Sequence, residues 1–148
     1  MDAMVVSGAV ACLSLSAVGS AIGTGLAAAS AVGSWKKCYA ANKPAPFTLL
    51  TFVGLPLSQT LYGMILMFVM CGKASIAGAG TAMLALGLFA GLGIGMSALF
   101  QGRAAAAACD AQAETGQGLA NYVIALGVVE TVAIFMMVFT IIALGKIA

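Results

Sequence analysis

The stretch "GVVETVAIF" (residues 127–135) places one glutamate, Glu130, inside an otherwise uncharged apolar run. That run extends over residues 115–145, and it is longer than the ~20 helical residues that cross a hydrocarbon core of ~30 Å. Three further apolar stretches of this kind, 3–35, 44–72 and 74–102, make up most of the remaining chain. The sequence therefore predicts an all-α membrane protein with four transmembrane helices.

The composition agrees with a membrane protein, because 63% of the 148 residues are hydrophobic and only 7% are charged, far from the usage of soluble domains. The strands of a membrane β-barrel alternate apolar and polar residues, whereas this chain is continuously apolar and rich in Ala, Leu, Met and Gly. We expect a single membrane domain over 1–148. The start "MDAMVV" carries Asp2 where a signal peptide has Lys or Arg, so we expect the first span to be retained.

Several function classes have no support in the sequence. The net charge is only +2 and no basic cluster with interleaved aromatic residues occurs, so we expect no nucleic-acid partner. The chain has no His, and its four Cys residues show no CxxC spacing, which disfavours zinc, haem and catalytic triads that use an imidazole. The cysteines are expected to pack as small apolar residues, and we predict no catalytic residue.

The positive charges suggest an orientation in the cell membrane, because Lys and Arg near the ends of spans are retained on the cytoplasmic side. The loop after the first span is the richest in them, and the opposite side has fewer. We therefore expect the loops between spans 1 and 2 and between spans 3 and 4 to be cytoplasmic, with both termini on the other side. The polar segment "CDAQAETGQGLAN" (109–121) is expected to form the second of these loops, either as a partner-docking segment or as a solvated turn. The charges used are Lys36, Lys37, Lys43 and Arg103 on the cytoplasmic side, and Lys73 and Lys146 on the other.

The two halves of the chain resemble each other, which predicts two tandem helical hairpins, about 3–72 and about 74–148. Sliding one half onto the other by 72 positions sets Gly19 beside Gly91, and a shift of 71 positions sets Gln59 opposite Glu130. The carboxylate is thus present only in the second hairpin. Glycines that recur every four residues in spans 1 and 3 predict close helix approach, although generic small-residue packing accounts for them equally well.

A carboxylate inside a membrane span costs some 2.5–3.5 kcal/mol on insertion scales and usually marks an ion or proton pathway. A protonated glutamate that merely packs is the alternative. The repeat puts Gln59 at the same depth as Glu130, and Gln101 comes level with them if its helix continues towards Cys109.

Around Gln59 the sequence reads "LPLSQTLYG" (55–63). Pro56 lacks an N–H and predicts a kink that frees the backbone carbonyl of Leu55. Ser58 and Gln59 add a hydroxyl and an amide oxygen, and Tyr62 lies on the same helix face, where its O–H can reach a carboxylate.

One carboxylate with several neutral oxygens is the ligand chemistry of a hard cation. The single negative charge suits Na⁺ better than Ca²⁺ or Mg²⁺. A proton carrier needs only the glutamate and an apolar surround, so the two extra amides favour Na⁺, with H⁺ as the alternative.

Taken together, the residues resemble the proteolipid of the rotor ring of V-type (V/A-type) ATPases, which is also known as the K or c subunit. The resemblance covers essentially the whole chain and rests on the four spans, the duplicated hairpins, "LPLSQTLYG", "FQG" (100–102) and "VVET" (128–131). It implies a homo-oligomeric ring in the lipid membrane that turns against a stator protein with an essential Arg and is attached to central-stalk subunits. ATP would be hydrolysed by other chains, so this one is a non-catalytic subunit.

The resemblance to the sodium-transporting members also implies a residue for each part of a sodium site. The ligands would be Leu55, Ser58, Gln59, Gln101 and Glu130, and Tyr62 would lock the glutamate. Ser58 stands where the family usually has Thr, which keeps the hydroxyl. Two other readings stay open: a small membrane channel that works without an ATPase, and a purely structural membrane role.

Overall fold

The computed structural model describes residues 2–76 and 78–147, and all regular structure within these ranges is helical. Four helical segments are long and apolar enough to cross a membrane. They are α1 (Ala3–Ala40), the broken segment α2 (Leu49–Gly54) with α3 (Ser58–Cys71), α4 (Gly80–Thr115) and α5 (Leu119–Leu144). The predicted all-α membrane fold with four spans is confirmed.

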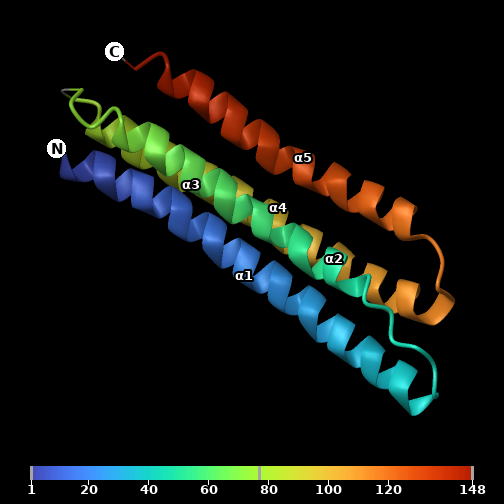
Figure 1. Cartoon of the computed structure of the whole chain (residues 1–148). Helices are drawn as coiled ribbons and strands as arrows, with labels where there is room; N and C mark the ends of the chain where they lie inside the picture. The colour runs from blue at the N-terminus through green and yellow to red at the C-terminus, as the bar shows by residue number, and fades with distance from the viewer. Residues whose placement is uncertain (1, 77, 148) are drawn as a thin grey trace.

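The spans run side by side, with both termini at one end of the bundle and the connections between spans 1 and 2 and between α4 and α5 at the other (Figure 1). At 1.5 Å per residue the 38 residues of α1 extend about 57 Å, so this helix passes well beyond a hydrocarbon core of ~30 Å. Asp2 caps its start, where the carboxylate accepts a hydrogen bond from the N–H of Met4 at 2.9 Å.

Pro56 breaks the second span as predicted. A 3₁₀ turn over Leu55–Leu57 separates α2 from α3, because proline has no N–H to donate to the preceding turn. Ser58, which begins α3, returns its backbone N–H to the carbonyl of Leu55. The break therefore places a non-α-helical carbonyl in the middle of the membrane-spanning segment.

The predicted loop over 109–121 is wrong for its first part, because α4 continues as a helix to Thr115. The alanine-rich sequence up to this point has high helix propensity, which polar side chains on a water-exposed helix do not cancel. The helix ends at Gly116, whose φ of 66° is a left-handed conformation that glycine adopts without strain. Only residues 116–118 connect α4 to α5.

Helices α1 and α4 form the most closely packed pair. A methyl group added at Gly19, Gly87 or Gly102 would collide with the backbone of the facing helix, at Gly95, Gly8 and Gly23 respectively. Contacts of this closeness are possible because glycine, which has no Cβ, lets the two backbones approach each other. The close approach predicted from the glycine spacing is confirmed, whereas the internal duplication stays a prediction.

The buried apolar side chains fall into two clusters along the bundle. One contains Val5, Leu66 and Ile94, and the other contains Ala27, Phe52 and Leu126. Gln59 and Gln101, both fully buried, belong to neither cluster. A set of polar side chains thus lies among apolar packing, where the cost of an unsatisfied polar group is high.

Candidate functional site

Glu130 projects from α5 and receives three hydrogen bonds from two other helices. Its Oε1 accepts from the hydroxyl of Ser58 at 2.5 Å and from the phenol of Tyr62 at 2.6 Å, both on α3. Its Oε2 accepts from Nε2 of Gln101, on α4, at 3.1 Å. Because a carboxylate only accepts hydrogen bonds, three donors from its neighbours are the environment that offsets the cost of its burial.

The hydroxyl of Ser58 lies among more acceptors than it can serve. Its Oγ is 2.9 Å from the carbonyl oxygen of Leu55, 3.2 Å from Oε1 of Gln59 and 2.5 Å from Oε1 of Glu130. A serine hydroxyl has one hydrogen and donates to one of these three at a time. Four oxygens therefore converge around the one hydroxyl proton of Ser58, with Tyr62 as a further donor to Glu130 and with one formal negative charge.

The two buried amides hold each other in a defined orientation. Nε2 of Gln59 donates to Oε1 of Gln101 at 2.8 Å, and this turns Oε1 of Gln59 towards Ser58. Nε2 of Gln101 donates to the carbonyl of Leu126 at 3.0 Å as well as to Glu130. Gln101 thus meets the carboxylate through its nitrogen, and a ligand role for Gln101 requires its amide to turn and present the oxygen.

The structure brings together all of the residues that the sequence analysis selected. They come from three spans and one 3₁₀ turn, and each is joined to at least one other by a hydrogen bond. The residues are Leu55, Ser58, Gln59, Tyr62, Gln101 and Glu130. That they bind an ion stays a prediction.

One residue of the cluster escaped the sequence analysis. The hydroxyl of Ser97, on α4, donates to the backbone carbonyl of Val129 on α5 at 3.0 Å. Ser97 is buried and lies one turn before Gln101 on the same face of α4. This four-residue spacing was the only signal in the sequence, and a serine among glycines and alanines otherwise reads as a small packing residue.

Glu130 is half-buried and opens onto an apolar outer surface. The neighbouring side chains on α5, Val128 and Val132, are 64% and 55% exposed, and Leu61 on α3 is 53% exposed. A carboxylate at such a surface is accessible to a charged group on a neighbouring protein. Its negative charge is stabilised only by the hydrogen-bond donors of its own site. The arrangement suits a group that is loaded and released from the side of the bundle.

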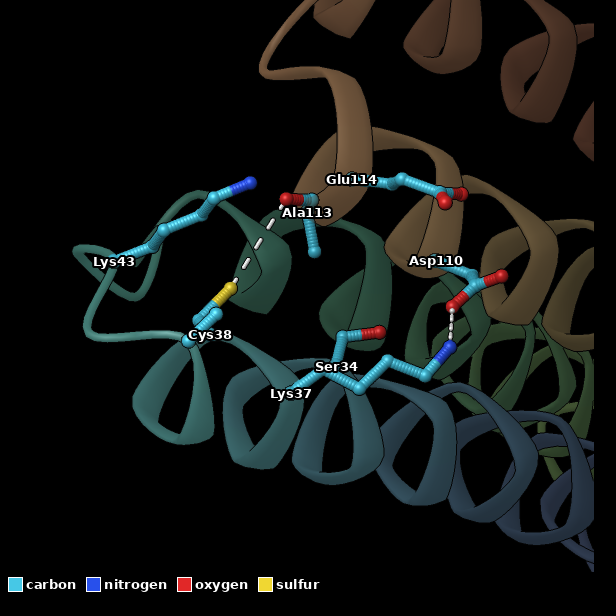
Figure 2. A pocket seen from close by; sticks show the side chains of 8 residues that line it. Ser34, Lys37, Cys38, Lys43, Asp110, Ala113 and Glu114 are labelled. Atoms are coloured by element: carbon cyan, nitrogen blue, oxygen red, sulfur yellow. Dashed lines mark hydrogen bonds and ion pairs between the residues drawn. The ribbon is translucent and has the colours of Figure 1, made fainter.

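A second polar cluster lies at the loop end of α1 and α4, around a cavity of about 170 Å³ (Figure 2). Lys37 pairs with Asp110 at 2.8 Å, and Lys43 and Glu114 also line the cavity. The two ammonium groups and two carboxylates balance each other, so the cavity favours ligands of neither sign. Because the Lys37–Asp110 pair is exposed to solvent, it contributes little stability. Docking of a partner at this end stays a prediction.

Comparison with known proteins bears on the second hairpin. Residues 84–143 match the family model that describes the C subunit of ATP synthase. The matched segment comprises most of α4 and nearly all of α5, including Ser97, Gln101 and Glu130. A search of the curated proteins finds no match. The hairpin that carries Gln101 and Glu130 is therefore similar to the C subunit of ATP synthase.

Proposed function

We propose that this chain is the ion-carrying subunit of the membrane rotor ring of a V-type ATPase, and that each copy in the ring binds one Na⁺ at Glu130. The match of residues 84–143 to the C subunit of ATP synthase supports a rotor role. The four apolar spans with one intramembrane carboxylate, in α5, favour the V-type variety. Gln59, the residue of the second span that corresponds to Glu130 in the repeat, is neutral.

The choice of Na⁺ rests on the oxygens around Ser58. Three acceptors lie within 3.2 Å of a hydroxyl that can donate to only one of them. A cation among these oxygens would bind all of them at once, with Glu130 balancing its charge and the carbonyl of Leu55, the Ser58 hydroxyl and Oε1 of Gln59 as neutral ligands. If its amide turned, Gln101 would add its Oε1 as a further ligand. In its present orientation it would instead donate from Nε2 to Oε2 of Glu130. A proton on Glu130 would add one donor among these acceptors, so the preference for Na⁺ over H⁺ rests on the additional neutral oxygens, which a proton carrier does not need.

The position of Glu130 at the outer surface of the bundle supports a route for the ion. In a ring of such subunits, each Glu130 would pass a stator arginine, whose positive charge competes with Na⁺ for the carboxylate. Glu130 would then release its ion into one access channel and load another from the second. Tyr62 and Gln101 would hold the loaded carboxylate in place while it faces lipid.

The other parts of the machine are separate chains in this proposal. Hydrolysis of ATP belongs to other subunits, and torque would reach the ring through central-stalk subunits at the loop end of the bundle. The loops would be cytoplasmic, and both termini would lie on the opposite side of the cell membrane.

The experiment that tests this function is carbodiimide labelling of Glu130 in the complex purified from membranes. Carbodiimides attack protonated carboxyl groups, so a bound cation protects the site. We expect Na⁺ to slow the labelling in a saturable way, whereas choline at the same ionic strength does not, and we expect Glu130→Gln to abolish labelling at this position. If saturating Na⁺ at mildly alkaline pH gave no protection, the sodium proposal would be wrong and a proton-carrying ring would take its place.

A further inference from the structure

Helix α5 has few polar attachments to the rest of the bundle, and they are concentrated in one turn. It is the least buried span, with 17% of its apolar window covered against 44% for α4. Within residues 2–76 and 78–147, the side-chain hydrogen bonds that join α5 to other helices all fall on Leu126, Val129 and Glu130. Apolar burial is non-directional, whereas these hydrogen bonds are directional, so this turn adds a specific constraint on the register of α5.

Two of these bonds end on backbone atoms of α5. Ser97 donates to the carbonyl of Val129, and Gln101 donates to the carbonyl of Leu126. The donors lie one turn apart on α4, and Val129 immediately precedes Glu130. Together they fix both the height of this turn and its rotation about the axis of α5.

Ser97 differs from the other donors because it makes no bond to the carboxylate, whereas Gln101 bonds both Glu130 and the carbonyl of Leu126. Ser58, Tyr62 and Gln101 all donate to Glu130 itself, and those bonds break when the glutamate leaves its place. The bond from Ser97 ends on the backbone carbonyl of Val129, so it does not require the carboxylate to stay in its place.

We infer that Ser97 is a positioning residue for the proposed ion site, which holds the turn 126–130 of α5 so that Glu130 returns to Ser58 and Tyr62 after each release. This inference rests on the proposed function. A simpler account is that a small residue is needed here for packing alone, and alanine would satisfy that requirement equally well. The substitution Ser97→Ala therefore separates the two accounts.

The experiment compares carbodiimide labelling in intact complexes purified from membranes, with the Na⁺ concentration that gives half-maximal protection as the readout. We expect Ser97→Ala to raise this concentration about threefold to tenfold, as interhelical hydrogen bonds of typical strength in membranes imply. The matched control is Ser16→Ala, because Ser16 is also buried and its hydroxyl donates within its own helix, to the carbonyl of Cys12. The control should match the wild type. Oligomer yield and melting temperature, measured on the same samples, should be unchanged in both variants.

Two further variants test the hydroxyl group itself. Ser97→Thr keeps the donor and Ser97→Val removes it at nearly the same volume, so Thr should bind Na⁺ more tightly than Val. The inference would be overturned if Ser97→Ala and the wild type needed the same Na⁺ concentration for half-maximal protection. It would also be overturned if Ser97→Ala and Ser16→Ala raised this concentration equally.

Failure of the proposed function would show separately, as absence of Na⁺ protection in the wild type. In that case the pH of half-maximal labelling becomes the readout for the same variants. A shift of this pH in Ser97→Ala that is absent in Ser16→Ala supports the positioning role, and no difference between them overturns it.

Discussion

Among single residues, Tyr62 offers the clearest test of how Glu130 is held. Its phenol donates to Oε1 of Glu130 at 2.6 Å, and Tyr62→Phe removes this bond while keeping the ring. Interhelical hydrogen bonds in membranes average about 0.6 kcal/mol and reach about 1.7 kcal/mol. We therefore expect the Na⁺ concentration for half-maximal protection to rise about threefold, and by no more than about twentyfold, measured by carbodiimide labelling of the complex.

Tyr122→Phe serves as the control, because the Tyr122 ring packs edge-on against Phe52, away from the site. The Na⁺ concentration for half-maximal protection of Tyr122→Phe should equal that of the wild type. Equal protection of Tyr62→Phe and wild type would mean that the phenol does not stabilise the loaded site.

Polar residues inside apolar spans could be identified from the sequence because each is costly there. Glu130, Gln59 and Gln101 stand out against their neighbours for this reason. The bond from Ser97 to Val129 could not be predicted in the same way. Its acceptor is a backbone carbonyl, which every residue possesses, and only the register of α4 against α5 decides which carbonyl is within reach.

Among the helices, the second span is interrupted at Pro56, and the 3₁₀ turn there leaves the carbonyl of Leu55 facing the site. Proline in a helix interior costs about 3 kcal/mol relative to alanine, so Pro56→Ala should join α2 and α3; because the lost packing of the fully buried ring opposes this gain, the melting temperature of the complex should change little. The carbonyl of Leu55 would then accept from the N–H of Gln59 in a regular helix and point along its axis. We expect the Na⁺ concentration for half-protection to rise at least threefold.

Pro44→Ala is a control for the loss of a proline away from the site, since Pro44 is exposed in the connection between α1 and α2. It should alter neither property. A Pro56→Ala complex with undiminished protection would show that the 3₁₀ turn is not required for binding.

The element boundaries show where the sequence was informative. Pro56 lacks a backbone N–H, and a proline in the interior of an α-helix interrupts it, so the break in the second span could be predicted from the sequence. The polarity of residues 109–115 predicts a loop, whereas Asp110 and Gln112 lie on α4, which continues as a helix to Thr115. The left-handed conformations at Gly116 and Gly118 mark the true turn.

For the whole molecule, the contact between α1 and α4 sets the frame on which α3 and α5 place the site. The glycine spacing predicted a smooth helix face, and the structure adds which residues meet: Gly8 with Gly87, Gly19 with Gly95 and Gly23 with Gly102. Sequence periodicity defines the face of one helix, but the vertical offset between two helices depends on all of their contacts together.

Gly102→Ala tests this frame, because its methyl group would collide with the backbone of Gly23, which has no side chain to move aside. Overpacking of this kind costs typically 1–3 kcal/mol, so we expect a lower melting temperature and a lower yield of assembled complex from detergent. Gly25→Ala is the control, since nothing lies within 4 Å of a Cβ added there, and its better helix propensity should leave the melting temperature unchanged or higher. If Gly102→Ala melted like Gly25→Ala, the backbones of α1 and α4 would have to lie farther apart than this fold requires. The position of Gln101, one residue before Gly102 on α4, would then need revision together with the site it supports.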